Sequence, residues 1–290
     1  MALRWKVSNI HASFRNPISG PEMHSILGIN YIERADIPLA LDLYLPQDKA
    51  PSGLIIFAHG GGFVKGNRAA APVQKLARRL TALGAAVASL SYRLKTEDRT
   101  LKVQERRHVY ANRKKAIDEG MKLAHHHMGP RFEAARQDMG EALRFLRAGH
   151  GPFDFSRSKF GYIGISAGGM IGLSLAFPDP LLPRFEKPAC VVTLGATLQH
   201  PWTLQRDAPG CLMVHSIEDR IVPTENCSIV NRYIQKVDAP VKIQICERRG
   251  HNAPVHALFR DSAPDGAPYW LQALALMRKT GVLNPLPAGA

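Results

Sequence analysis

The sequence predicts an α/β protein with a mostly parallel central sheet and helices on both faces of that sheet. Short continuous apolar runs alternate along the chain with amphipathic stretches, which is typical of buried parallel strands joined by crossover helices. The 290 residues suit one large domain over residues 1–290. Hydrophobic residues make up 45% of the chain, enough for a sizeable buried core.

The first expected element is a hairpin. Ile29–Arg34 and Leu39–Leu45 show the alternation of strands, with a turn around 35–38. After it, Leu54–Ala58 is apolar at every position, as expected for a strand buried on both faces. The remaining expected strands are Ala85–Leu90, Phe160–Ile165, Val191–Leu194, Leu212–His215 and Val241–Ile245.

Helices are expected between these strands. Helical spacing of apolar residues, with charges on the opposite side, predicts helices over Pro72–Leu83 and Gln137–Arg147. A helix of small residues over Gly168–Ala176 ends before Pro178, and a further helix is expected over Cys227–Val237.

Residues 95–137 interrupt the alternation with a long, basic stretch that contains no convincing strand. Such long connections are usually functional lids or inserts. We expect a helical insert over the carboxyl edge of the sheet, helical from about Lys102 to Leu123. The triplet His125–His127 does not predict a metal site, because consecutive helical residues point about 100° apart. We expect these histidines on a solvated face.

Ser166 is the strongest candidate for a catalytic residue. It is the centre of Gly164-Ile165-Ser166-Ala167-Gly168, between an expected buried strand and a small-residue helix, which is the context of a nucleophile elbow. Glycines two residues before and after the serine remove Cβ atoms that would collide in so tight a turn. The hydroxyl is then expected above the sheet, at the positive end of the following helix.

A glycine run follows the strand that ends at Ala58, in His59-Gly60-Gly61-Gly62-Phe63. Glycines at a strand end leave backbone N–H groups that a ligand can approach closely. The N–H groups of Gly61 and Gly62, with that of Ala167, are therefore expected to form an oxyanion hole.

A serine hydroxyl needs a base within hydrogen-bond reach. Among 12 histidines, His251 follows the last expected strand, which puts it on the same sheet edge as Ser166. His256 is a weaker rival, and His200 and His215 precede the acid in the chain order serine, acid, histidine. The acid is expected after the preceding strand, where Asp219 fits, with Glu218 as the alternative.

These segments resemble α/β-hydrolases of the hormone-sensitive-lipase and acetylesterase-like group. The likeness rests on Ala58–Phe63, Ser91–Leu94, Gly164–Gly169 and the stretches around Asp219 and His251, and spans roughly residues 40–260. It implies the α/β-hydrolase fold and a carboxylic-ester hydrolase without a cofactor. Ile165 stands where close relatives of hormone-sensitive lipase often have aspartate, which moves the resemblance toward the carbohydrate- and feruloyl-esterase-like branch.

The expected reaction is acyl transfer through an ester of Ser166, with a pocket shaped by the insert, His59, Phe63 and Trp202. A polyester depolymerase or a peptidase with the same triad is the alternative among enzymes. A non-catalytic homologue that binds a small ligand is the alternative outside enzymes, and the presence of His251 counts against it.

The formal net charge of +14 and the basic insert favour an anionic ester substrate, small or oligomeric. No basic stripe with aromatic residues indicates a nucleic-acid partner, no run of about 18 apolar residues indicates a membrane span, and a homo-oligomer stays open. The first residues lack the apolar stretch of a secretory signal, so a cytoplasmic protein is expected unless a signal has been removed. Cys190, Cys211 and Cys246 lie in or beside apolar, strand-like runs and are expected as buried free thiols, and no Cys-x-x-Cys pair supports a metal site.

Overall fold

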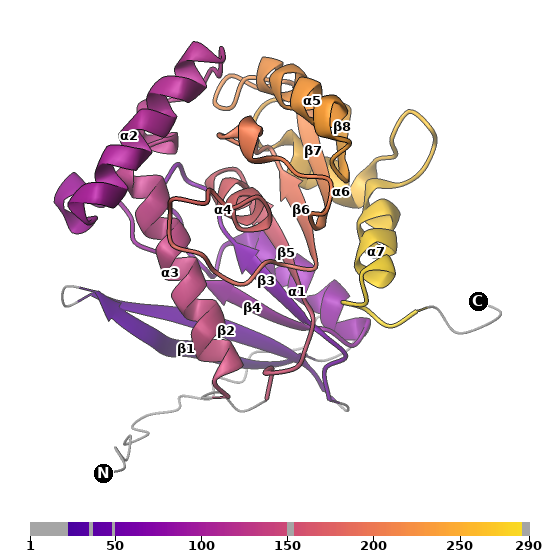
Figure 1. Cartoon of the computed structure of the whole chain (residues 1–290). Helices are drawn as coiled ribbons and strands as arrows, with labels where there is room; N and C mark the ends of the chain where they lie inside the picture. The colour runs from indigo at the N-terminus through magenta and orange to yellow at the C-terminus, as the bar shows by residue number, and fades with distance from the viewer. Residues whose placement is uncertain (1–22, 35–36, 48–49, 150–153, 286–290) are drawn as a thin grey trace, which may run out of the picture.

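The computed structural model describes residues 23–34, 37–47, 50–149 and 154–285, and Figure 1 shows their arrangement around one twisted sheet. The sheet has eight strands in the order β1-β2-β4-β3-β5-β6-β7-β8. The strands are β1 (Met23–Arg34), β2 (Ile37–Pro46), β3 (Leu54–Ala58), β4 (Ala86–Leu90), β5 (Phe160–Ile165), β6 (Cys190–Leu194), β7 (Gly210–Glu218) and β8 (Val241–Arg249).

The strands β3 to β8 are parallel, while β1 and β2 form the antiparallel hairpin at one edge. Each parallel strand was expected from a short apolar run, and β3 and β5 have the predicted bounds. Every residue of β3, β4 and β6 is buried, because helices cover both faces of the sheet. The predicted fold class is therefore confirmed. Of the predicted hairpin turn, residues 35 and 36 lie outside the described residues.

Two hydrophobic cores lie on the two faces of the sheet (Figure 1). One contains apolar side chains from α3 (Pro130–Arg147), α4 (Ala167–Ala176) and α5 (Glu225–Val237). The other contains side chains from α1 (Ala71–Ala82), α6 (Ala253–Arg260) and α7 (Tyr269–Lys279). The sequence did not lead us to expect α6 or α7, which complete the cover of the second face.

The insert is partly helical, as expected, but its boundary differs from the prediction. Helix α2 spans Val103–Asp118, and α3 begins at Pro130 instead of Gln137. The first two turns of α3 looked polar because they contain Glu133 and Arg136. In the fold these two side chains are buried together, with Arg136 Nε 2.7 Å from Glu133 Oε2, so the helix packs inward from its first turn.

Helix α2 is tied to three separate connections of the sheet. His108 Nε2 and Asn112 Nδ2 contact the two carboxylate oxygens of Asp179, at 2.9 and 2.8 Å. Lys115 Nζ lies 4.3 Å from the ring centroid of Trp202. After the helix, Lys122 N donates to Asn226 Oδ1 at 2.8 Å, and Asn226 Nδ2 donates back to Lys122 O at 3.0 Å. The insert is thus fixed by contacts from several elements.

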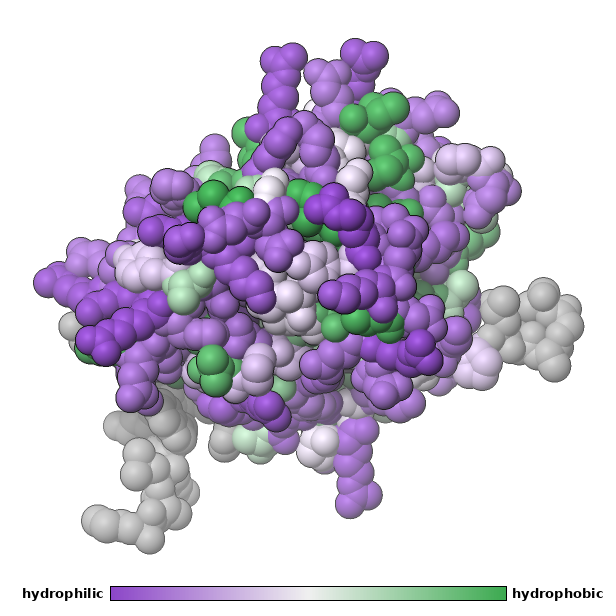
Figure 2. Space-filling view, turned by 45° about the horizontal axis from the view of Figure 1, so that its top comes forward, coloured by the Kyte–Doolittle hydropathy of each residue, from purple (hydrophilic) through white to green (hydrophobic). Residues whose placement is uncertain are grey.

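The face seen in Figure 2 is mainly hydrophilic, with small separate hydrophobic patches. No helix in the described part of the chain combines the length and the apolarity that a membrane span requires.

Candidate active site

Ser166 lies in the turn between β5 and α4, with φ 50° and ψ −119°, a backbone conformation that residues with a Cβ rarely adopt. A Cβ on Gly164 would lie 2.5 Å from Gly168 C and O. A Cβ on Gly168 would lie 2.3 Å from Ala58 O. The two glycines therefore allow β5, α4 and β3 to approach so closely. The turn is held by Ser166 N, which donates to Leu194 O at 2.9 Å.

The structure brings the three predicted triad residues together. His251 Nε2 lies 2.8 Å from Ser166 Oγ, and His251 Nδ1 lies 2.8 Å from Asp219 Oδ2. Because the carboxylate can only accept, Nδ1 carries a proton and Nε2 of the neutral imidazole is free to accept the serine proton. The carboxyl ends of the parallel strands β5, β7 and β8 meet at one edge, which places the three side chains there.

Asp219 is held as an anion. Its Oδ1 accepts hydrogen bonds from Ile221 N at 2.9 Å and Val222 N at 3.0 Å, while Oδ2 faces the imidazole of His251. Burial raises the pKa of Asp219, but the hydrogen bonds from His251 and the two backbone N–H groups outweigh it, so the pKa is lowered from its ordinary value. A charged carboxylate can stabilise the imidazolium that forms when His251 takes a proton.

The alternative residues lie elsewhere. The carboxylate of Glu218 is partly exposed and pairs with Arg249, with Oε2 3.2 Å from Arg249 Nη1. His256 is exposed, and in the described part of the chain the imidazole that contacts Ser166 Oγ is that of His251. His215 is buried beneath the acid and its Nε2 donates to Val222 O at 2.8 Å. His200 is buried and stacks on Trp202.

The glycine run lies directly beside the serine. A Cβ on Gly60 would lie 3.2 Å from Ser166 Cβ, and Gly61 and Gly62 have φ of 119° and 63°. Within the described residues, the backbone N–H groups of Gly61, Gly62 and Ala167 donate to no acceptor. Three N–H groups without partners near a nucleophile are what binding of a negative oxygen requires.

Two of the expected pocket residues have a different place in the structure. His59 and Phe63 are buried, and the rings of both pack against neighbouring aromatic side chains. The ring of His59 stacks on Tyr92 at 4.3 Å between centroids, and Phe63 packs against Tyr92 and Phe132. Both side chains therefore support the glycine run from beneath. Trp202 is partly exposed and stays a candidate for the pocket wall.

Sequence reasoning missed two residues that contact the site. Gly195, after β6, has φ 66°, and a Cβ there would lie 2.9 Å from His251 O, so a side chain would displace the histidine loop. The second is His127, in the 3-10 helix His125–His127. The prediction of a solvated face is wrong for His127, whose side chain is buried against Phe63, with ring centroids 6.3 Å apart. Its place in a run of three polar residues concealed its burial.

The described residues contain no group of three or more histidine, cysteine or acidic side chains arranged to hold a metal ion. Cys190, Cys211 and Cys246 are free and buried, as expected, and so is Cys227. Burial raises the pKa of the Cys190 thiol to about 11, so this thiol stays protonated at neutral pH.

Comparisons with known proteins agree with this architecture. The BD-FAE family model matches residues 41–105. The structure of Thermogutta terrifontis esterase 2 phosphorylated by paraoxon aligns with a TM-score of 0.62 at 16% identity, covering 94% of this chain and 100% of that one. The butyrate-bound and propionate-bound forms of the same esterase give TM-scores of 0.60 and 0.61 at 15% and 16% identity, each covering 93% of this chain and 97% of theirs. No curated protein matches the sequence.

Proposed function

The chain has the α/β-hydrolase fold, and from this premise we propose that it is a serine carboxylesterase. Ser166 is the nucleophile, His251 the general base and acid, and Asp219 the residue that orients and stabilises the imidazole. The single observation that carries the proposal is the continuous chain of hydrogen bonds from Ser166 Oγ through His251 to Asp219, each 2.8 Å long.

In the proposed reaction, Ser166 Oγ attacks the carbonyl carbon while its proton passes to His251 Nε2. The carbonyl oxygen becomes negative and accepts hydrogen bonds from the N–H groups of Gly61, Gly62 and Ala167. When the intermediate collapses, the alcohol leaves with the proton from His251. Water then attacks the acyl-serine by the same steps, which releases the acid and restores the serine.

The burial of the nucleophile favours small acyl groups. Only 4% of the Ser166 surface is exposed; the glycine run packs beside the serine, and His126 and His127 of the insert pack in turn on Gly62. The butyrate-bound and propionate-bound esterase structures that align with this chain fit the same proposal of a short-chain carboxylate product. A long acyl chain would require the insert to move.

We further propose that the substrate carries negative charge. A surface hollow of about 600 Å³ adjoins His251 and is lined by Arg248, Arg249 and His256 among others. Asp261 neutralises Arg248 and Glu218 pairs with Arg249, so the attraction is moderate and depends on ionic strength. Salt that lowers the kcat/KM of a succinyl ester but not of a neutral butyryl ester would support this charge preference, and equal responses of the two esters would contradict it.

The test of the esterase assignment uses p-nitrophenyl butyrate and a fluorophosphonate probe with the wild-type protein and the Ser166→Ala variant. We expect the wild type to hydrolyse the ester and to be labelled once, and the variant to do neither while keeping its thermal unfolding midpoint. Labelling or burst kinetics in Ser166→Ala would overturn the assignment, as would an inert wild type. An amide analogue and a polyester film, run in parallel, separate the peptidase and depolymerase alternatives.

A further inference from the structure

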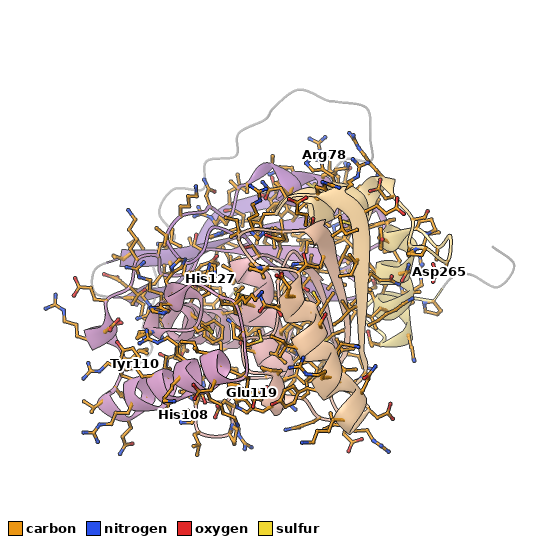
Figure 3. All side chains as sticks on the ribbon, turned by 90° about the horizontal axis from the view of Figure 1, so that it is seen from above. Arg78, His108, Tyr110, Glu119, His127 and Asp265 are labelled. Carbon is orange, nitrogen blue, oxygen red and sulfur yellow. The ribbon has the colours of Figure 1, made fainter. Side chains whose placement is uncertain are left out.

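The segment His125–His127 of the insert packs directly on the glycine run. A Cβ built on Gly62 would lie 3.3 Å from the Nε2 atoms of both His126 and His127, so two imidazoles converge on one point of the proposed oxyanion loop. The two rings lie 4.3 Å apart between centroids. In Figure 3, His127 lies between α2 and the sheet, further inside than His108 and Tyr110 on α2.

The side chain of His127 is only 2% exposed. Its Nδ1 atom is buried and has no partner among the described residues. Because Nδ1 has no acceptor nearby, the ring proton is better placed on Nε2, the atom that faces Gly62.

The backbone of His127 is well held, so its position is defined. His127 O accepts a hydrogen bond from Gln199 Nε2 at 3.1 Å, and His127 N donates to Ala124 O at 2.9 Å. Gln199 belongs to the connection that begins with Gly195, which packs against His251. The backbone that carries this imidazole is therefore attached to the same loop that packs against the proposed base.

His127 is a neutral imidazole at the pH where esterases work. Burial, followed by the charges of His126 and His251, lowers its pKa to about 4. A neutral ring can donate one hydrogen bond without placing a second positive charge beside the imidazolium of His251. A cation at this position would oppose the proton transfer that the proposed mechanism requires.

We propose that His127 is a further catalytic residue, which donates a hydrogen bond from Nε2 to the carbonyl oxygen of the bound ester as that oxygen becomes negative. The inference rests on the proposed esterase function and deepens it, because the oxyanion hole then contains a side chain from the insert as well as backbone N–H groups. The insert takes part in the chemistry in addition to shaping the pocket.

The test compares three variants on p-nitrophenyl acetate, propionate and butyrate. His127→Phe keeps the aromatic packing against Phe63 but has no donor, His127→Gln retains an N–H donor, and His125→Phe is the matched control in the exposed part of the same segment. We expect His127→Phe to lower kcat by about 100-fold on all three esters with little change in KM, as for loss of one oxyanion donor. His127→Gln should lose less, and His125→Phe should match the wild type.

Thermal unfolding separates catalysis from packing. If His127 only fills space, His127→Phe will keep its kcat while His127→Gln loses activity together with stability, and this pattern would overturn the inference. A His127→Phe activity equal to that of the wild type would also overturn the inference. So would a higher activity, because it would mean that the imidazole obstructs the site. Both results leave the esterase assignment standing if the wild type is active and Ser166→Ala is not. An inert wild type would overturn both.

Discussion

Replacing Asp219 with asparagine should prevent His251 from acting as the base in the proposed reaction, while the hydrogen bonds around position 219 keep their geometry. Two backbone N–H groups, of Ile221 and Val222, donate to Oδ1, so the amide oxygen of asparagine will take that place. Its NH₂ group then faces His251 Nδ1 and donates to it. Nδ1 becomes an acceptor, the ring proton moves to Nε2, and the imidazole can no longer accept the proton of Ser166.

The expected loss in kcat is about 10⁴-fold, the value for this change in serine proteases. That is about 5 kcal/mol of transition-state stabilisation. The assay is the initial rate of p-nitrophenyl butyrate hydrolysis at saturating substrate. Glu218→Gln is the control, because Glu218 is the neighbouring carboxylate and faces Arg249 instead of the imidazole. A loss of activity in Glu218→Gln, with Asp219→Asn retaining a tenth or more of the wild-type kcat, would refute the reasoning.

The same substitution should change how stability depends on pH. The pKa of Asp219 is lowered in the fold, although burial acts against this, because His251 and the backbone N–H groups bind the anion. The contribution of ionised Asp219 to the free energy of unfolding is therefore complete above the unfolded-state pKa of about 3.9. It is lost as the pH falls through the lower pKa of the folded state. Urea unfolding at several pH values should show wild type more stable than Asp219→Asn at neutral pH, with the gap closing below about pH 4. A constant gap would contradict the depressed pKa.

Two further predictions concern the elbow and a buried histidine. Gly168→Ala would put a Cβ 2.3 Å from Ala58 O, and because Cβ contacts under 3.0 Å essentially do not occur, the turn must shift. We expect kcat to fall by about 100-fold and the free energy of unfolding to fall by about 1–3 kcal/mol. An unchanged kcat would contradict this prediction. Burial lowers the pKa of His200 to about 4, so the unfolded chain binds a proton that the fold excludes between about pH 6.5 and 4. As the pH falls from about 6.5 to 4, the free energy of unfolding should therefore decrease. In His200→Phe this decrease should be smaller, by up to about 1.4 kcal/mol per pH unit. Urea titrations that give parallel curves for the two proteins would contradict the prediction.

The sequence was informative where one physical requirement dominates. A parallel strand covered on both faces must be apolar at every position, so Leu54–Ala58 and Phe160–Ile165 could be delimited from their residues alone. Loops that follow parallel strands share one edge of the sheet, and this, with the chain order serine, acid, histidine, led to Ser166, Asp219 and His251. Their contacts follow from the topology and needed no knowledge of distances.

The sequence was uninformative where burial depends on a distant partner. The helix that begins at Pro130 was expected only from Gln137, because the burial of Glu133 and Arg136 in its first turns depends on their pairing, which is visible only in the fold. His127 looked solvated because nothing near it in the sequence indicates the glycine run on which it packs. The role of Gly195 depends in the same way on a histidine loop more than 50 residues away.

The contact between the insert and Gly62 couples substrate selectivity to the rate of the chemical step, two properties that an enzyme could otherwise change separately. A cap that only covered the entrance could be exchanged or lengthened to accept new esters, with the rate of the chemical step preserved. Here His126 and His127 of the insert pack on Gly62, in the loop beside Ser166. Each change of selectivity that repositions the cap will therefore also alter turnover, and diversification of this protein toward larger esters should require compensating substitutions in the glycine loop.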